Sequence, residues 1–83
     1  MDAEANGIAL LVKIFSDKRL FVHFLRLRSA ATEQQVAVAI LDAVKTAIGL
    51  GIAEPASVAE ELGGWKGGWL ALRDAIASAI APT

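Results

Sequence analysis

The sequence predicts an all-α fold, a compact bundle of about five short helices around a central helix at residues 32–49. Apolar residues recur at helical spacing in segments that are separated by glycine, proline or polar breaks. Alanine, the strongest helix former, is abundant, and 55% of the residues are hydrophobic. A chain of 83 residues is expected to form one small domain over residues 1–83.

Residues 8–28 allow two interpretations. In the first, two helices are separated by the polar break at residues 16–19, where Ser16 caps the second helix and Asp17 lies in its first turn. Their apolar faces are Ile8, Leu11, Val12 and Phe15, and then Leu20, Phe21, Phe24 and Leu25. In the second, the break is the turn of a β-hairpin, which would give an α+β fold. Frequent leucine and a turn without glycine favour the helices.

The central helix has both a start and a stop signal. Thr32 is a favourable N-cap, and Gln35 stands where the second half of a capping box belongs. Gly49 and Gly51 can take the left-handed conformation that ends helices. The expected buried stripe is Val36, Ile40, Val44 and Ala47, widened by Ala37, Leu41 and Ile48. The outer face, marked by Val38, Asp42 and Lys45, has little polarity, so we expect another element or another chain to contact it.

Two shorter helices are expected in the C-terminal half. Pro55 opens the first, which points Val58 and Leu62 inward and ends at Gly63. The segment GGWKGGW at residues 63–69 is too rich in glycine to continue a helix. The last helix runs from about residue 69 to 81, and its apolar face is Trp69, Leu72, Ile76 and Ile80.

Composition narrows the classes of function. The net charge of −1 argues against nucleic-acid binding by the domain as a whole. The chain has no cysteine and one histidine, so we expect no metal and no cofactor. No segment approaches the roughly 20 apolar residues of a membrane span. The acidic start lacks the basic region of a secretory signal, and a cytoplasmic location is therefore expected.

No catalytic arrangement is indicated by residue spacing. Glu60 and Glu61 are adjacent, so their side chains diverge on a helix and do not form a carboxylate pair. The glycine-rich segment has neither the length nor the hydroxyl of a phosphate-binding loop. We therefore expect a protein that is not an enzyme.

Candidate partner-binding residues form two groups of opposite charge and one aromatic position. They are the basic stripe Arg19, His23 and Arg26, the acidic pair Glu60 and Glu61, and the aromatic Trp65. A solvated helix face is the simpler interpretation of the basic stripe. The functional hypothesis is a protein–protein interaction module of adaptor type that binds a protein partner or itself as a homo-oligomer. The basic group of one copy would meet the acidic group of the next.

Two alternatives come from other classes of function. Residues 57–64, SVAEELGG, resemble the first helix and turn of a helix-turn-helix, as in a small DNA-binding regulator. The helix that follows offers only Lys66 and Arg73 as basic groups, which argues against this reading. A membrane-surface or assembly accessory protein is the other alternative.

Overall fold

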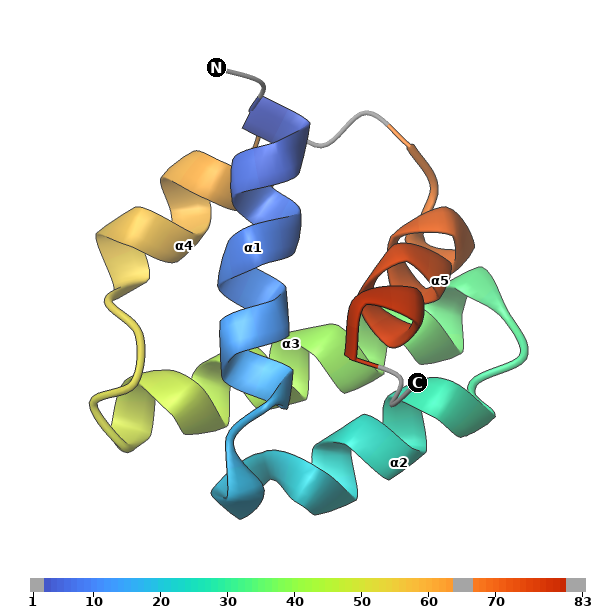
Figure 1. Cartoon of the computed structure of the whole chain (residues 1–83), viewed down its shortest axis with the longest axis horizontal. Helices are drawn as coiled ribbons and strands as arrows, with labels where there is room; N and C mark the ends of the chain where they lie inside the picture. Colours follow the sequence, from blue (N-terminus) through green and yellow to red (C-terminus); the bar gives the residue numbers. More distant parts are fainter. Residues whose placement is uncertain (1–2, 64–66, 81–83) are drawn as a thin grey trace.

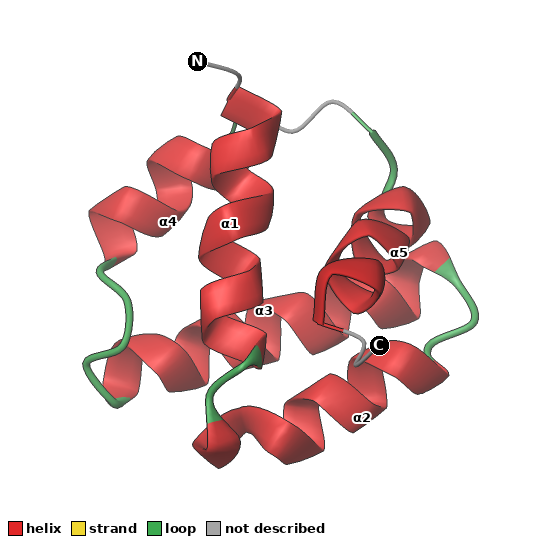
Figure 2. Ribbon diagram, in the orientation of Figure 1, coloured by secondary structure: helices red, strands yellow, loops and turns green. Residues whose placement is uncertain are grey.

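Five α-helices and one short 3-10 helix make up the part of the chain that the computed structural model describes, residues 3–63 and 67–80 without the side chains of residues 3–7 and 61 (Figure 1). The elements are α1 (Ala3–Phe15), η1 (Lys18–Leu20), α2 (Phe21–Ser29), α3 (Glu33–Gly49), α4 (Pro55–Leu62) and α5 (Trp69–Ile80). The described residues contain helices and loops without a strand (Figure 2). The all-α prediction is confirmed.

The alternative β-hairpin at residues 8–28 is wrong, and the polar break explains why. The Asp17 carboxylate accepts a hydrogen bond from the Arg19 backbone N–H at 2.9 Å, which caps η1 and turns the chain directly into the next helix. Ser16 is not the cap, because its hydroxyl donates back to the Val12 carbonyl oxygen at 2.6 Å. Asp17 therefore ends one helical segment and starts another.

Helix α3 crosses the molecule, and α1, α2 and α5 pack on it, whereas α4 packs on α1 (Figure 1). Its start is as expected, since Thr32 Oγ1 accepts from the Gln35 backbone N–H at 3.1 Å. The return bond of the capping box is displaced by one residue, because Gln35 Oε1 accepts from the Ala31 N–H at 2.7 Å. At the other end, Gly49 is still helical, and Gly51, with φ of 77°, supplies the left-handed residue.

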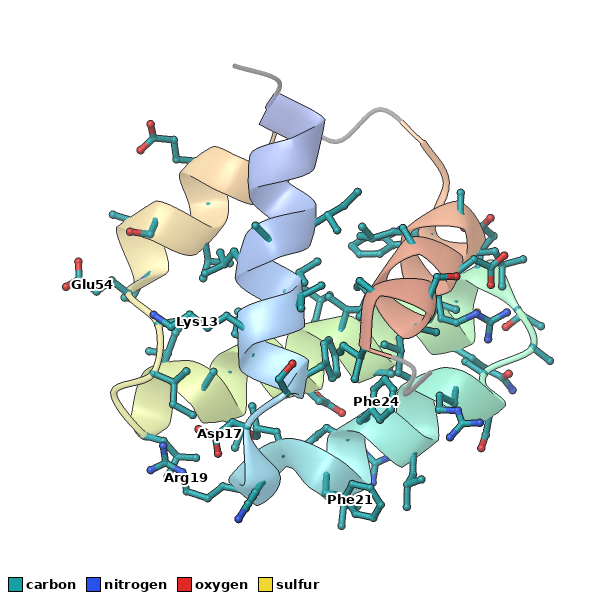
Figure 3. The ribbon with its side chains drawn as sticks, viewed as in Figure 1. Lys13, Asp17, Arg19, Phe21, Phe24 and Glu54 are labelled. Atoms are coloured by element: carbon teal, nitrogen blue, oxygen red, sulfur yellow. The ribbon has the colours of Figure 1, made fainter. Side chains whose placement is uncertain are left out.

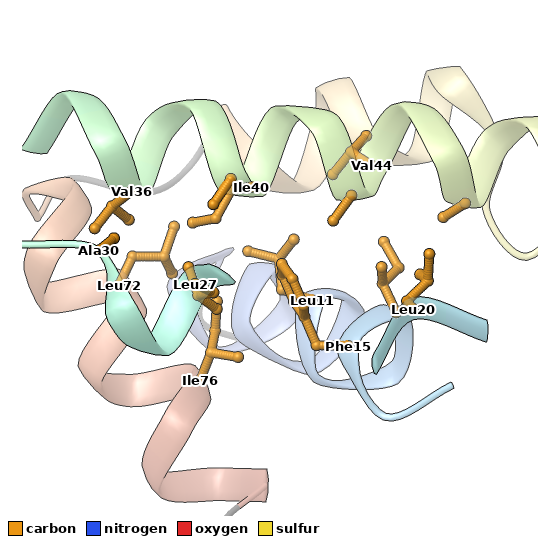
Figure 4. Close-up of a cluster of buried hydrophobic side chains, with 14 of the residues drawn as sticks. Leu11, Phe15, Leu20, Leu27, Ala30, Val36, Ile40, Val44, Leu72 and Ile76 are labelled. Atoms are coloured by element: carbon orange, nitrogen blue, oxygen red, sulfur yellow. The ribbon is translucent and has the colours of Figure 1, made fainter. Parts of the chain in front are cut away.

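The buried stripe of α3 is confirmed in its centre and displaced at its edge. Val36, Ile40, Val44 and Ala47 are buried as expected, and they face Leu11, Leu27, Leu72 and Ile76 from three other helices (Figure 4). The stripe is widened by Ala39 and Ala43, whereas Leu41 is 54% exposed. These two alanines each lie three residues before a side chain that contacts α2, Asp42 and Thr46 respectively. Helical spacing therefore puts them on the side of α3 toward α2, where small side chains allow close approach.

Helix α2 is rotated relative to the expected face. Leu20 and Leu27 are buried, but Phe21 and Leu25, predicted to be inside, are 58% and 43% exposed. Figure 3 shows Phe21 directed away from the other helices. The 3-10 turn Lys18–Leu20 separates Leu20 from α2, and within α2 the buried residue is Leu27, on the side opposite Phe21 and Leu25.

The remaining apolar faces follow the prediction with small shifts. Leu11, Ile14 and Phe15 are buried on α1, while Val12 is only half-buried. On α4 and α5, Val58, Leu72 and Ile76 are buried, and Leu62, Trp69 and Ile80 pack at the edge of the core.

Two charged side chains join α5 to the connection between α2 and α3. Glu33 Oε2 accepts from the backbone N–H groups of Trp69 at 2.6 Å and Leu70 at 3.2 Å, and so caps the start of α5. A Cβ on Gly68 would lie 2.8 Å from Glu33 Oε1, so a glycine leaves room for this carboxylate.

Arg73 makes the complementary bonds at the end of α2. Its Nη1 donates to the carbonyl oxygen of Ala30 at 2.7 Å, with longer approaches to those of Arg28 and Leu27 at 3.3 and 3.4 Å. Both contacts place a charge where the helix dipole favours it, the anion at a helix start and the cation at a helix end.

We predict that replacing Glu33 with alanine lowers the free energy of unfolding by about 1 kcal/mol, because two N–H donors of α5 lose their acceptor. Glu33→Gln should lose less, since an amide oxygen still accepts. The matched control is Glu60→Ala, which removes an exposed glutamate from α4. Urea denaturation followed by circular dichroism measures all three. Equal losses in Glu33→Ala and Glu60→Ala would contradict the role of the cap.

Candidate interaction surface

Arg19, the first residue of the expected basic stripe, is bound within its own turn. Its guanidinium Nε and Nη2 donate to the two carboxylate oxygens of Asp17, each at 3.0 Å. This hydrogen bonding from the Arg19 side chain, with that from its backbone N–H, lowers the pKa of Asp17 from 3.8 to about 2. Much of the charge of Arg19 is therefore balanced locally, which reduces its value as a partner-binding group.

We predict that Arg19→Met raises the pKa of Asp17 from about 2 toward 3.8. The rise should be incomplete, because the backbone N–H of residue 19 continues to donate. A depressed carboxylate pKa contributes stability above pH 3.8, and this contribution is lost as the pH falls through about 2. In the Arg19→Met variant this stabilising contribution should be smaller, and it should be lost at a higher pH than in the unaltered chain. Carboxyl NMR titration measures the shift, and Arg28→Met, which leaves the Asp17–Arg19 pair intact, should leave the Asp17 titration unchanged.

His23, the second residue of the stripe, is half-buried between α2 and α3. Its Nε2 lies 3.4 Å from Thr46 Oγ1, and that hydroxyl donates to the Asp42 carbonyl oxygen at 2.9 Å. Because the hydroxyl hydrogen is used there, Nε2 is the group that donates to Thr46. Nδ1 is buried without a hydrogen-bond partner among the described residues. His23 is thus a packing residue of the α2–α3 contact.

We predict that His23→Leu leaves the free energy of unfolding unchanged or raises it by up to about 1 kcal/mol, because it removes a buried nitrogen that has no partner. Thr46 keeps its bond to Asp42 in this variant. Thermal and urea unfolding measure the effect. If His23→Leu lowered the free energy of unfolding by more than about 1 kcal/mol, the imidazole would have to make a stabilising contact that the structure does not contain.

Arg26, the third residue of the stripe, bridges α2 and α3 at the surface. Its Nη1 lies 3.6 Å from Asp42 Oδ2, and the two side chains are 56% and 49% exposed. Such an exposed pair contributes little to stability. The pair is more informative about the arrangement of the helices. Arg26 contacts Asp42, and the earlier His23 contacts the later Thr46, so α2 and α3 run antiparallel.

The other candidate residues are only partly described. Glu60 is exposed on α4, a helix that packs against α1. The side chain of Glu61 and the whole of Trp65 lie outside the described residues. Glu60 thus lies on a different helix from His23 and Arg26.

The geometry offers little to a DNA-reading helix. Helix α4 packs on α1, whereas α5 packs on α1 and α3. Arg73, one of the two basic groups that such a reader would use, is directed at the carbonyl oxygens that end α2. The exposed positions of α5 within its described length are Ala71, Asp74, Ser78 and Ala79, which carry no positive charge.

A surface that residue spacing did not reveal lies on α2 and α3. Large apolar side chains are exposed there by 43–65%: Phe21, Val22, Leu25, Val38 and Leu41. On each helix these residues point away from the buried arc, on either side of the ion pair of Arg26 and Asp42. We call this set, with the ion pair, the outer face. The only signal in the sequence was the low polarity around Val38.

A groove of about 530 Å³ opens at one end of the outer face, where α2 turns into α3. Its walls are both polar and apolar: Arg26, Ser29, Ala30, Thr32, Gln34, Gln35 and Val38. A smaller hollow of about 190 Å³ lies beside Leu62, Gly67, Trp69 and Leu72. The larger groove continues the outer face and adds hydrogen-bonding groups to its apolar surface.

Two further features, metal sites and membrane spans, can be assessed in the described residues. Within them, carboxylate and imidazole side chains form no group of three that could hold a metal ion. None of the described helices combines the length and hydropathy that crossing a bilayer requires. Comparisons with known protein families, with characterised proteins and with solved structures give no match for this chain.

Proposed function

We propose that this chain is a protein–protein interaction module without catalytic activity, and that it associates with a second copy of itself through the outer face. The observation that carries the proposal is the exposure of five large apolar side chains on two neighbouring helices. Large apolar side chains gathered on the exposed sides of neighbouring helices are typical of interaction sites. An adaptor role and a cytoplasmic location are compatible with it and stay predictions.

A second copy fits the charges of the outer face. Arg26 and Asp42 place one positive and one negative charge side by side near its centre, and the exposed Lys45 adds a positive charge on the same side of α3. A strongly acidic or basic partner would gain from the charge of one sign and be repelled by the charge of the other. A copy related by two-fold symmetry presents the same pair in return, so each charge can meet its opposite.

The size of the molecule limits the strength of this association. A standard interface buries about 800 Å² on each partner, roughly a sixth of the surface area of 5024 Å². The molecule measures 28 × 27 × 27 Å, so one whole face is needed for such an area. Without a described tryptophan or tyrosine on the face to act as an anchor, we expect reversible dimerisation with a Kd on the order of micromolar.

The charge-group hypothesis remains a separate prediction. It requires Arg19 and Arg26 of one copy to meet Glu60 and Glu61 of another. Arg26 belongs to the outer face, but Arg19 is bound to Asp17 and Glu60 lies on α4. We therefore favour the outer face. A variant that alters only Leu25 distinguishes the two hypotheses.

We predict that Leu25→Glu weakens self-association at least about tenfold, because a charge replaces an apolar side chain at the interface. Leu50→Glu is the matched control: both leucines are 43% exposed, but Leu50 is the C-cap of α3 and lies outside the outer face. Sedimentation velocity over a concentration series gives the dimer fraction. Circular dichroism confirms that both variants are folded.

Two results would count against the proposal. If the unaltered chain stays monomeric up to millimolar concentration, self-association is excluded. If Leu25→Glu and Leu50→Glu weaken a dimer equally, the contact surface is not the outer face.

A further inference from the structure

We infer that two copies pair with α2 of each lying on α3 of the other, so that Arg26 meets the partner's Asp42 and Leu25 meets the partner's Leu41. This register rests on the proposed self-association and specifies its geometry. Three observations carry it: the antiparallel run of α2 and α3, the central ion pair, and the positions of the exposed leucines on the two helices.

The ion pair marks the middle of the outer face. Arg26 lies on the side of α2 toward α3, and Asp42 on the side of α3 toward α2, because their side chains approach to 3.6 Å. A two-fold axis that runs between the helices, parallel to both, exchanges these positions. It therefore places the guanidinium of each copy over the carboxylate of the other, and the four charges alternate in sign.

The leucines lie outside the ion pair on each helix. Leu25 is one residue before Arg26, which turns it about 100° around α2, away from α3. Leu41 is one residue before Asp42 and is turned away from α2 in the same manner. The same two-fold axis carries Leu25 onto the partner's Leu41, at the outer margin of α3. Each pair of opposite charges is then flanked by apolar contacts that exclude water, which strengthens it.

The other two-fold arrangement is less favourable. An axis perpendicular to the helices stacks α2 on the partner's α2 and α3 on the partner's α3. With that axis near the middle of α2, Leu25 approaches its own equivalent and the two Arg26 side chains also come together. Like charges at an interface are repulsive, so the charges of the outer face favour the exchange of α2 and α3.

The test uses two charge variants, each of which reverses one member of the ion pair. In this register each variant alone brings like charges together, whereas in the stacked arrangement like charges already face each other and neither variant changes that. Arg26→Asp puts two carboxylates on the outer face of one chain, and Asp42→Arg puts two guanidinium groups on the other. Each variant alone should dimerise at least about tenfold more weakly than the unaltered chain. An equimolar mixture should recover a heterodimer, because the new carboxylate at position 26 meets the new guanidinium at position 42.

Cross-linking supplies an independent measurement, since the chain has no cysteine of its own. A mixture of Leu25→Cys and Leu41→Cys chains should form the mixed disulfide under mild oxidation, in preference to the Leu25→Cys homodimer. A Leu50→Cys chain in place of either controls for random collision. A disulfide needs Cα atoms within about 7 Å, so its formation reports the register directly.

The outcomes separate the register from the proposed function. Weaker dimerisation of each charge variant alone, together with the mixed disulfide, supports the exchange of α2 and α3, and recovery in the mixture shows that the charges face each other across the contact. If the unaltered chain dimerises and Leu25→Glu prevents it, but mixing the charge variants restores nothing, the register is overturned and self-association through the outer face stands. Preferred formation of the Leu25→Cys homodimer overturns the register in favour of the stacked arrangement. A chain that is monomeric at all concentrations overturns both.

Discussion

The contacts of Glu33 and Arg73 are the constraint on which the rest of the structure depends. Glu33 is the first residue of α3, and it caps a helix that begins 36 residues later. Arg73 belongs to that later helix and binds the carbonyl oxygens where α2 ends. Together they hold the start of α5 and the turn between α2 and α3 in one place. The buried face of α5, with Leu72 and Ile76, can then lie on the stripe of α3.

The position of α2 follows from this constraint and from packing. Its end is held by Arg73, and His23, near its start, packs against Thr46 on α3. Leu20 and Leu27 fill the space that remains toward the core. A helix of nine residues can bury only one arc, yet α2 carries apolar residues on nearly all sides. The excess, Phe21 with Val22 and Leu25, must therefore face outward, and it forms half of the outer face.

The elements could be predicted because their signals are local. The cap at Thr32, the stripe from Val36 to Ala47 and the apolar face around Leu72 each arise from spacing within one segment. The rotation of α2 could not be predicted, because too many of its residues are apolar for periodicity to select one side. The contacts of Glu33 and Arg73 carry no local signal either, since their partners are dozens of residues away.

The spatial neighbours of the candidate partner-binding residues could not be predicted, for the same reason. Spacing grouped Arg19, His23 and Arg26 on one helical face, but the 3-10 turn before α2 separates the first from the others. Each of the three then has its own neighbour in space: Asp17, Thr46 and Asp42 respectively. One of these neighbours, Asp17, is close in sequence, whereas the other two lie on α3 and emerge only with the tertiary structure.

The geometry of the outer face bears on the kind of assembly that this chain can form. Some contacts join unlike surfaces, such as a basic group on α2 of one copy and an acidic group on α4 of another. A dimer of this kind keeps one free basic group and one free acidic group, so further copies can be added. The outer face contacts its own equivalent, so two copies satisfy each other and the assembly closes. Its opposite charges lie 3.6 Å apart within each copy, which keeps its long-range field weak. Association then depends mainly on apolar contact, with the ion pairs selecting the register. Salt should consequently affect a closed dimer of this kind far less than a chain of copies joined through separated basic and acidic groups.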